Sequence, residues 1–155
     1  MKRSEFLLNV GHSLAACQLL EFELKLYIER AFEVARKKTS GVVHFGFSGS
    51  DYEDSSLEKL ISVFRKLTNN RELCRKLDEF RKDRNFVAHK AIAACVDPEG
   101  GLDESKVAEV QVLLSRVSQE ARSLSDQILE ESKCFFGHHY IDEEPNQSAQ
   151  PTPAR

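Results

Sequence analysis

An arginine, an asparagine and a histidine lie within six residues of one another, at Arg84, Asn85 and His89. A neutral imidazole, whose reference pKa is about 6.5, accepts a proton readily near neutral pH. A guanidinium binds the oxygens of a phosphate and stabilises the negative charge that builds on them during a reaction. An amide beside them orients the imidazole or donates to the same phosphate. These residue types predict proton transfer at an anionic substrate, with Arg84, Asn85 and His89 as the candidate catalytic residues.

The position of Arg84 in the helical pattern also sets it apart. It falls on an apolar stripe with spacings of three and four, formed by Leu73, Leu77, Phe80, Val87 and Ala91. A guanidinium facing a helical interface costs several kcal/mol unless an anion or a wet cleft meets it there. A functional site is one explanation. The structural alternative is that Arg84 pairs with a carboxylate of a neighbouring helix, while Asn85 and His89 cap or bridge the helices.

Helical geometry separates the three residues. Asn85 and His89 lie on one face, roughly 40° apart. Arg84 and His89 diverge by roughly 140° and are separated by roughly 7.5 Å along the axis of an unbroken helix. Either the helix ends near Val87, or a second copy of the chain completes the site across a symmetric interface. We favour the second explanation.

The pattern Arg84-Asn85, three residues, then His89 resembles the HEPN superfamily (higher eukaryotes and prokaryotes nucleotide-binding). Its signature is an arginine, a polar residue directly after it, and a histidine separated from the arginine by four to six residues, in a small all-helical domain. The resemblance covers roughly residues 4–133. In one toxin branch of the superfamily, a tyrosine two residues after the histidine is adenylylated by a nucleotidyltransferase antitoxin. This chain has Ala91 there, so that regulation does not carry over.

The resemblance implies a dimeric endoribonuclease of toxin–antitoxin or phage-defence type that needs no metal or other cofactor. RNA is the expected substrate, and a protein antitoxin is a possible further partner. His89 would take the proton of the 2′-hydroxyl, and Arg84 would hold the phosphate. Three further basic residues would contribute positive electrostatic potential and contact the substrate: Arg81, Lys82 and Lys90. The competing hypothesis is a catalytically silent helical dimer that acts as a binding or regulatory module, similar to mannitol-operon-repressor-like proteins.

Length and composition predict one domain over residues 1–140, followed by a disordered tail over residues 141–155 that is rich in proline and acidic residues. The 155 residues are 41% hydrophobic and 30% charged, as in an ordinary soluble protein. No apolar run is long enough for a membrane span, and the first residues lack a signal-peptide core. Four scattered cysteines without a Cys-x-x-Cys pair favour reduced thiols in a cytoplasm over a disulfide frame or a zinc site.

The charge of the chain is unevenly distributed around a net value of −3. Residues 65–90 hold nine Lys or Arg against four Asp or Glu, whereas residues 91–155 hold five against twelve. The motif therefore lies in a basic block, and the local field governs attraction to phosphates. The alternative interpretation is an ordinary solvated helix face in which acidic side chains alternate with basic ones.

Hydrophobic periodicity predicts an all-α fold, an antiparallel four-helix bundle. The expected helices run from Ser4 to Lys37, from a capping box at Ser55 and Glu58 to Leu67, from Arg71 to Ala93, and from an Asp103 or Ser105 cap to Lys133. Asn69-Asn70 is expected to end the second helix and cap the third, and residues 97–101 to form a turn.

The first helix carries apolar residues off its main stripe, at Leu19, Phe22, Leu26 and Tyr27, which predicts a homodimer or, alternatively, a helix covered on all sides. The loop aromatics of residues 39–54 are expected to pack beneath the connection rather than to stack on a base. His138 and His139, adjacent on a tail, do not have the spacing of a metal site.

Overall fold

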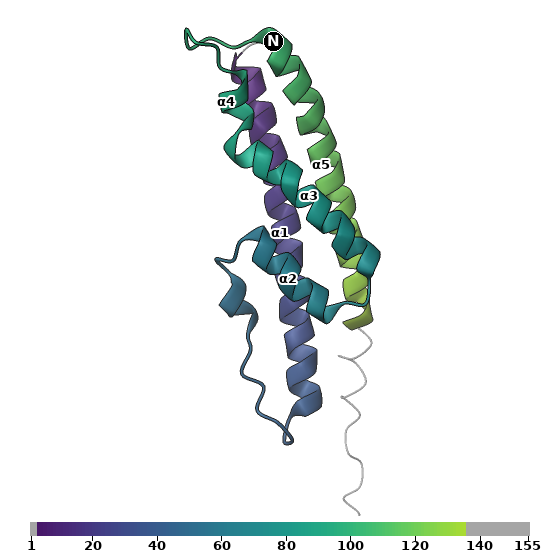
Figure 1. Ribbon diagram of the computed structural model, residues 1–155. Coiled ribbons are helices and arrows are strands. Elements are labelled where there is room, and N and C mark those ends of the chain that lie inside the picture. Colours follow the sequence, from purple (N-terminus) through teal and green to yellow (C-terminus); the bar gives the residue numbers. More distant parts are fainter. Residues whose placement is uncertain (1–2, 136–155) are drawn as a thin grey trace, which may run out of the picture.

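The structure, a computed structural model, describes residues 3–135, and the regular elements within that range are all helices, joined by loops and accompanied by one isolated bridge between Val96 and Leu102. The predicted tail and the His138-His139 pair lie outside the described residues. In Figure 1 the shorter helices pack along the two longest ones. The elements are α1 (Arg3–Thr39), η1 (Gly49–Tyr52), α2 (Leu57–Leu67), α3 (Arg71–His89), α4 (Ala91–Cys95), α5 (Glu104–Ser132) and η2 (Lys133–Phe135).

The two longest helices, α1 and α5, lie side by side and run parallel (Figure 1). Hydrogen bonds join Asn9 to Gln111 near one end and Arg30 to Ser132 near the other, so residue numbers rise together along both helices. The expected antiparallel order is therefore wrong for this pair. The reason is the connection after α1, which returns along that helix and lets α2 begin beside its middle.

That returning connection, residues 40–56, is held against α1 by contacts between aromatic rings and by the close approach of one glycine. The ring of Phe32 lies 5.7 Å from that of Phe45, 6.0 Å from that of Phe47 and 5.8 Å from that of Tyr52, between centroids. Gly49 lies so close to Glu29 that a Cβ there would be 2.7 Å from the Glu29 Cβ. The expected packing of the loop aromatics is confirmed for Phe45, whereas the Phe47 side chain stays largely exposed.

Helices α2 and α3 cover the α1–α5 pair, and α3 runs diagonally across it (Figure 1). The apolar residues of the predicted α3 stripe are buried. The helices α1, α2 and α5 also each bury a set of apolar side chains. Burial of each large apolar side chain contributes about 1.5–3 kcal/mol. The largest fully buried side chains include Phe6, Leu20, Leu24, Ile28, Leu60, Phe64, Leu77, Phe80, Leu114 and Leu124.

Two helix boundaries differ from the sequence-based expectation. The N-cap of α2 is Ser56, whose hydroxyl accepts from the Lys59 amide, so the capping box expected one residue earlier is wrong. The third helix ends at His89 rather than Ala93, because Lys90 leaves the helical region at φ −128°, and the short α4 follows. This break accompanies the full burial of Ala91 and Cys95. The caps expected at Asn70 and Asp103 are confirmed.

Candidate functional site

Arg84 points from α3 into the α1 interface and meets a carboxylate there. Its Nη2 lies 2.7 Å and its Nε 2.9 Å from Oε1 of Glu21 on α1. The side chains are 24% and 16% exposed, so both charges are withdrawn from most of the solvent. An ion pair of this geometry satisfies the arginine that interrupts the apolar stripe. The inward position predicted for Arg84 is confirmed, and the anion that meets it is part of the protein.

Glu21 was not identified from the sequence, although a signal for it exists. It follows Cys17 by four residues and precedes Ile28 by seven, which places it beside the buried stripe of α1. An acid at such a position, like the arginine on α3, needs a partner. Two residues of opposite charge, each on or beside the buried stripe of its own helix, are candidates to pair, and this would have suggested the Arg84–Glu21 contact.

Arg84 also contacts its neighbour in the motif. Its Nη1 lies 3.4 Å from Oδ1 of Asn85, a long hydrogen bond in which the guanidinium donates. Two N–H groups of the guanidinium therefore donate hydrogen bonds, from Nε to Glu21 and from Nη1 to Asn85, and Nη2 faces Glu21 in the ion pair. The contact turns the Asn85 oxygen toward Arg84 and leaves its NH₂ group for another partner.

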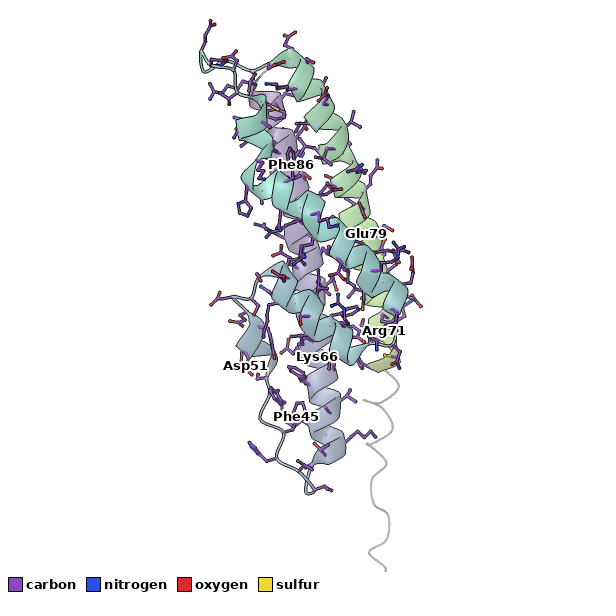
Figure 2. All side chains as sticks on the ribbon, in the orientation of Figure 1. Phe45, Asp51, Lys66, Arg71, Glu79 and Phe86 are labelled. Carbon is purple, nitrogen blue, oxygen red and sulfur yellow. The ribbon has the colours of Figure 1, made fainter. Side chains whose placement is uncertain are left out.

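The exposed side of α3 near its C-terminus carries the histidine. His89 is the last residue of α3, and its side chain is exposed. It shares a surface pocket of about 400 Å³, which we call the α3 pocket, lined by Lys82, Asn85, Phe86, His89 and Lys90. Figure 2 labels Phe86 near the end of α3 where this pocket lies. The structure thus gathers four of the six candidate residues here, while Arg84 and Arg81 point elsewhere.

Most arginines of the basic block are neutralised within the described residues. Arg81 pairs with Glu58 of α2, Arg65 with Asp78, and Arg75 with both Glu72 and Glu79. Arg116 of α5 in turn pairs with Asp83. Among the described carboxylates that pair with arginines of this block, only those of Glu58 and Glu21 come from outside it, so these two reduce its surplus of positive charge, whereas Arg116 adds to it. Lys82 and Lys90 differ, because no carboxylate of residues 3–135 lies within ion-pair distance of either.

A buried thiol adjoins the Arg84–Glu21 pair. Burial raises the pKa of Cys17 to about 11, an increase that the positive charge of Arg84 opposes and the negative charge of Glu21 reinforces. The thiol is therefore protonated at neutral pH and acts as a small apolar side chain. Cys74 and Cys95 are also buried and free, whereas the free Cys134 is exposed.

No cluster of three or more histidine, cysteine or acidic side chains among residues 3–135 is placed to hold a metal ion. None of the helices in that range combines the length and the apolar character that crossing a membrane requires.

Together these contacts divide the motif into an inward part and an outward part. The inward part is the Arg84–Glu21 pair, and the outward part is the α3 pocket with its imidazole, amide and two ammonium groups. Asn85 connects them, since it contacts Arg84 and also lines the pocket. Comparison of the chain with protein-family models, with curated proteins and with solved structures found no match.

Proposed function

We propose that this chain is a metal-independent endoribonuclease of the HEPN type that cleaves RNA at the α3 pocket. The observation that carries the proposal is the exposed imidazole of His89 in one pocket with Asn85, Lys82 and Lys90. Neither lysine is neutralised by a carboxylate of residues 3–135. Such a pocket attracts phosphates and presents a base to them.

The proposed reaction uses the 2′-hydroxyl of the RNA as the nucleophile. His89 accepts the 2′-hydroxyl proton, the 2′-oxygen attacks the adjacent phosphorus, and the bond from phosphorus to the 5′-oxygen breaks. A proton from solvent neutralises the leaving 5′-oxygen, so the products are a 2′,3′-cyclic phosphate and a 5′-hydroxyl. Lys82 and Lys90 balance the charge of the phosphate, and the amide of Asn85 donates to one of its oxygens.

In this proposal Arg84 acts from the side of the pocket. Its contact with Asn85 orients that amide. Glu21 holds the guanidinium in place in the absence of substrate. Arg81, which pairs with Glu58, contributes to the field around the site rather than to a direct contact.

The proposal includes an assembly. We infer that α1, α2, α3 and α5 form the four-helix unit of a HEPN-like domain, that the protein is a cytoplasmic homodimer, and that a protein antitoxin is a further partner. The separation of Arg84 from the histidine pocket supports the dimer. A second copy can supply a phosphate-binding group to a pocket from which this chain's own arginine is turned away.

The direct test is incubation of the purified protein with RNA in EDTA, followed by analysis of the termini. Wild type is expected to leave 2′,3′-cyclic phosphate ends, and His89→Ala is expected to lose activity by about two orders of magnitude or more, as for removal of a general base. His44→Ala is the matched control, because His44 is exposed on the loop after α1. Cleavage by His89→Ala at the wild-type rate would refute the role of His89.

A second candidate function is favoured by the Arg84–Glu21 pair itself. An arginine neutralised within the fold is what a catalytically silent binding module would contain. Expression in a host separates the two functions. Growth arrest that disappears in His89→Ala supports the nuclease, whereas RNA binding without cleavage by wild type, in EDTA or in Mg²⁺, supports the silent module.

A further inference from the structure

The outward face of α1 carries exposed apolar residues between Leu8 and Phe22. Leu8, Leu19 and Phe22 are 57%, 63% and 54% exposed, and Ala15 lies between them on the same face. These four residues follow one another at spacings of seven, four and three, so they form a single stripe, which we call the α1 stripe. Isolated exposed apolar residues are ordinary on a protein surface, but a continuous stripe along one helix marks an interaction surface.

The α1 stripe ends where the same face becomes charged. Continuing along the face, the next outward positions are Leu26, which is partly buried, and then Glu29 and Glu33, which are exposed. Solubility alone would favour charged residues along the whole exposed face. From Lys25 onward this side of α1 meets the chain's own connection, because Lys25 donates to the Glu53 carbonyl and Gly49 lies against Glu29, so a partner can cover roughly residues 8–22.

Gly11 supplies an independent observation on the same face. A Cβ at Gly11 would meet nothing within 4 Å, so packing inside this chain does not require a glycine. A glycine in a helix interior costs about 1 kcal/mol relative to alanine. Such a glycine is explained when the backbone of another chain, or a large side chain from it, approaches closely.

We propose that the α1 stripe is the self-association surface of this protein and that it pairs with the same stripe of a second copy in antiparallel order. In that order, about a two-fold axis at Ala15, Leu8 faces Phe22 of the other copy and Gly11 faces Leu19. Gly11 thus leaves room for Leu19, Leu8 packs against Phe22, and no charged residue lies at these positions. An interface of this kind is isologous, since the same patch serves both subunits.

The proposal rests on the homodimer suggested above, but not on RNA cleavage. Phe22, at the end of the stripe, directly follows Glu21, but successive residues of a helix point about 100° apart, so the stripe and the Arg84–Glu21 pair lie on different sides of α1. A substitution on the stripe is expected to change the association state whether or not the protein cleaves RNA.

Sedimentation of the full chain, without RNA, tests the surface. Wild type is expected to have twice the chain mass of 17.6 kDa at micromolar concentration. Leu19→Glu and Phe22→Glu are each expected to raise the dimer dissociation constant at least about tenfold, because they bury a charge in the pairing. Val112→Glu, at an exposed apolar residue of α5 outside the stripe, is the control and is expected to remain dimeric. Circular dichroism checks that each variant is folded.

A short bismaleimide crosslinker tests the order of the pairing in a Cys134→Ser background, which removes the exposed native thiol. Ala15→Cys is expected to crosslink to itself. Leu8→Cys is expected not to crosslink to itself, since its counterpart would lie about 21 Å away along the helix axis.

A monomeric wild type overturns the homodimer as well as the surface. A dimer that both glutamate variants leave intact overturns the surface alone, and crosslinking at both cysteines overturns the antiparallel order.

Discussion

Arg84 and Glu21, 63 residues apart in the chain, form the ion pair that joins the motif helix α3 to α1. Both side chains are mostly buried, so the loss of one partner leaves the other with its charge unpaired at a helix interface. The same contact neutralises the arginine that the proposed chemistry would use. It therefore affects both the stability of the fold and the field at the α3 pocket.

Removal of one partner of this pair is expected to destabilise the protein. Glu21→Ala and Arg84→Ala should each lower the free energy of unfolding by about 1–3 kcal/mol, and the double variant should lose less than the sum of the two. Denaturant titration of the three variants measures the coupling. Glu72→Ala is the control, since its ion pair with Arg75 is exposed to solvent and contributes little to stability. Full additivity would show that the two residues do not interact in solution.

Reversal of the lysine charges in the α3 pocket is expected to weaken RNA binding. Lys82→Glu and Lys90→Glu should each reduce affinity, and should lower the slope of log affinity against log salt by about 0.7 per lost phosphate contact with single-stranded RNA. Fluorescence anisotropy over a salt series measures both quantities. Lys66→Glu provides the same charge change at an exposed lysine of α2 that does not line the pocket. Equal effects in all three variants would argue against a localised RNA site.

The protein is expected to lose stability at alkaline pH through Tyr27. Burial raises the pKa of this phenol from 10 to about 12, so between these values the unfolded chain releases the proton while the folded chain retains it. The stabilisation is complete below about pH 10 and decreases by up to about 1.4 kcal/mol per pH unit above it.

Tyr27→Phe isolates this contribution, because it keeps the ring contacts with Phe64 and Phe135 and removes the ionisable group. Unfolding free energies of wild type and variant should converge, or cross, on going from about pH 8 to about pH 11. Cys17 also titrates in this range, but it is present in both proteins and cancels in the comparison. A constant difference between the two proteins across that range would contradict the assignment.

The N-cap of α2 can be tested by substitution, with the preceding serine as the control. Ser56→Ala is expected to destabilise the protein by about 1 kcal/mol, because it removes the acceptor of the Lys59 amide. Ser55→Ala should have a much smaller effect, although its sequence context, with Glu58 three residues later, matches a capping box. Thermal or denaturant unfolding of the two variants measures the difference, and a larger effect at Ser55 would place the cap one residue earlier.

The sequence by itself determined the helices and the inward position of Arg84. Both depend on hydrophobic periodicity, which is local: burying Leu73, Leu77, Phe80 and Val87 requires a helix with Arg84 on the same face. The N-caps at Asn70 and Asp103 could also be predicted from the sequence, because a capping side chain accepts hydrogen bonds from amides two or three residues away.

Only the tertiary structure decided what surrounds those helices. The parallel course of α1 and α5 depends on a returning loop whose path is fixed by ring contacts with Phe32. The sequence around Lys90 contains no glycine or proline that would predict the helix break there. The break follows from the packing of Ala91 and Cys95. The pairing of Arg84 with Glu21 joins two helices whose relative placement no local pattern contains. Periodicity specifies which face of a helix turns inward, but the residue that it meets depends on how the helices pack together.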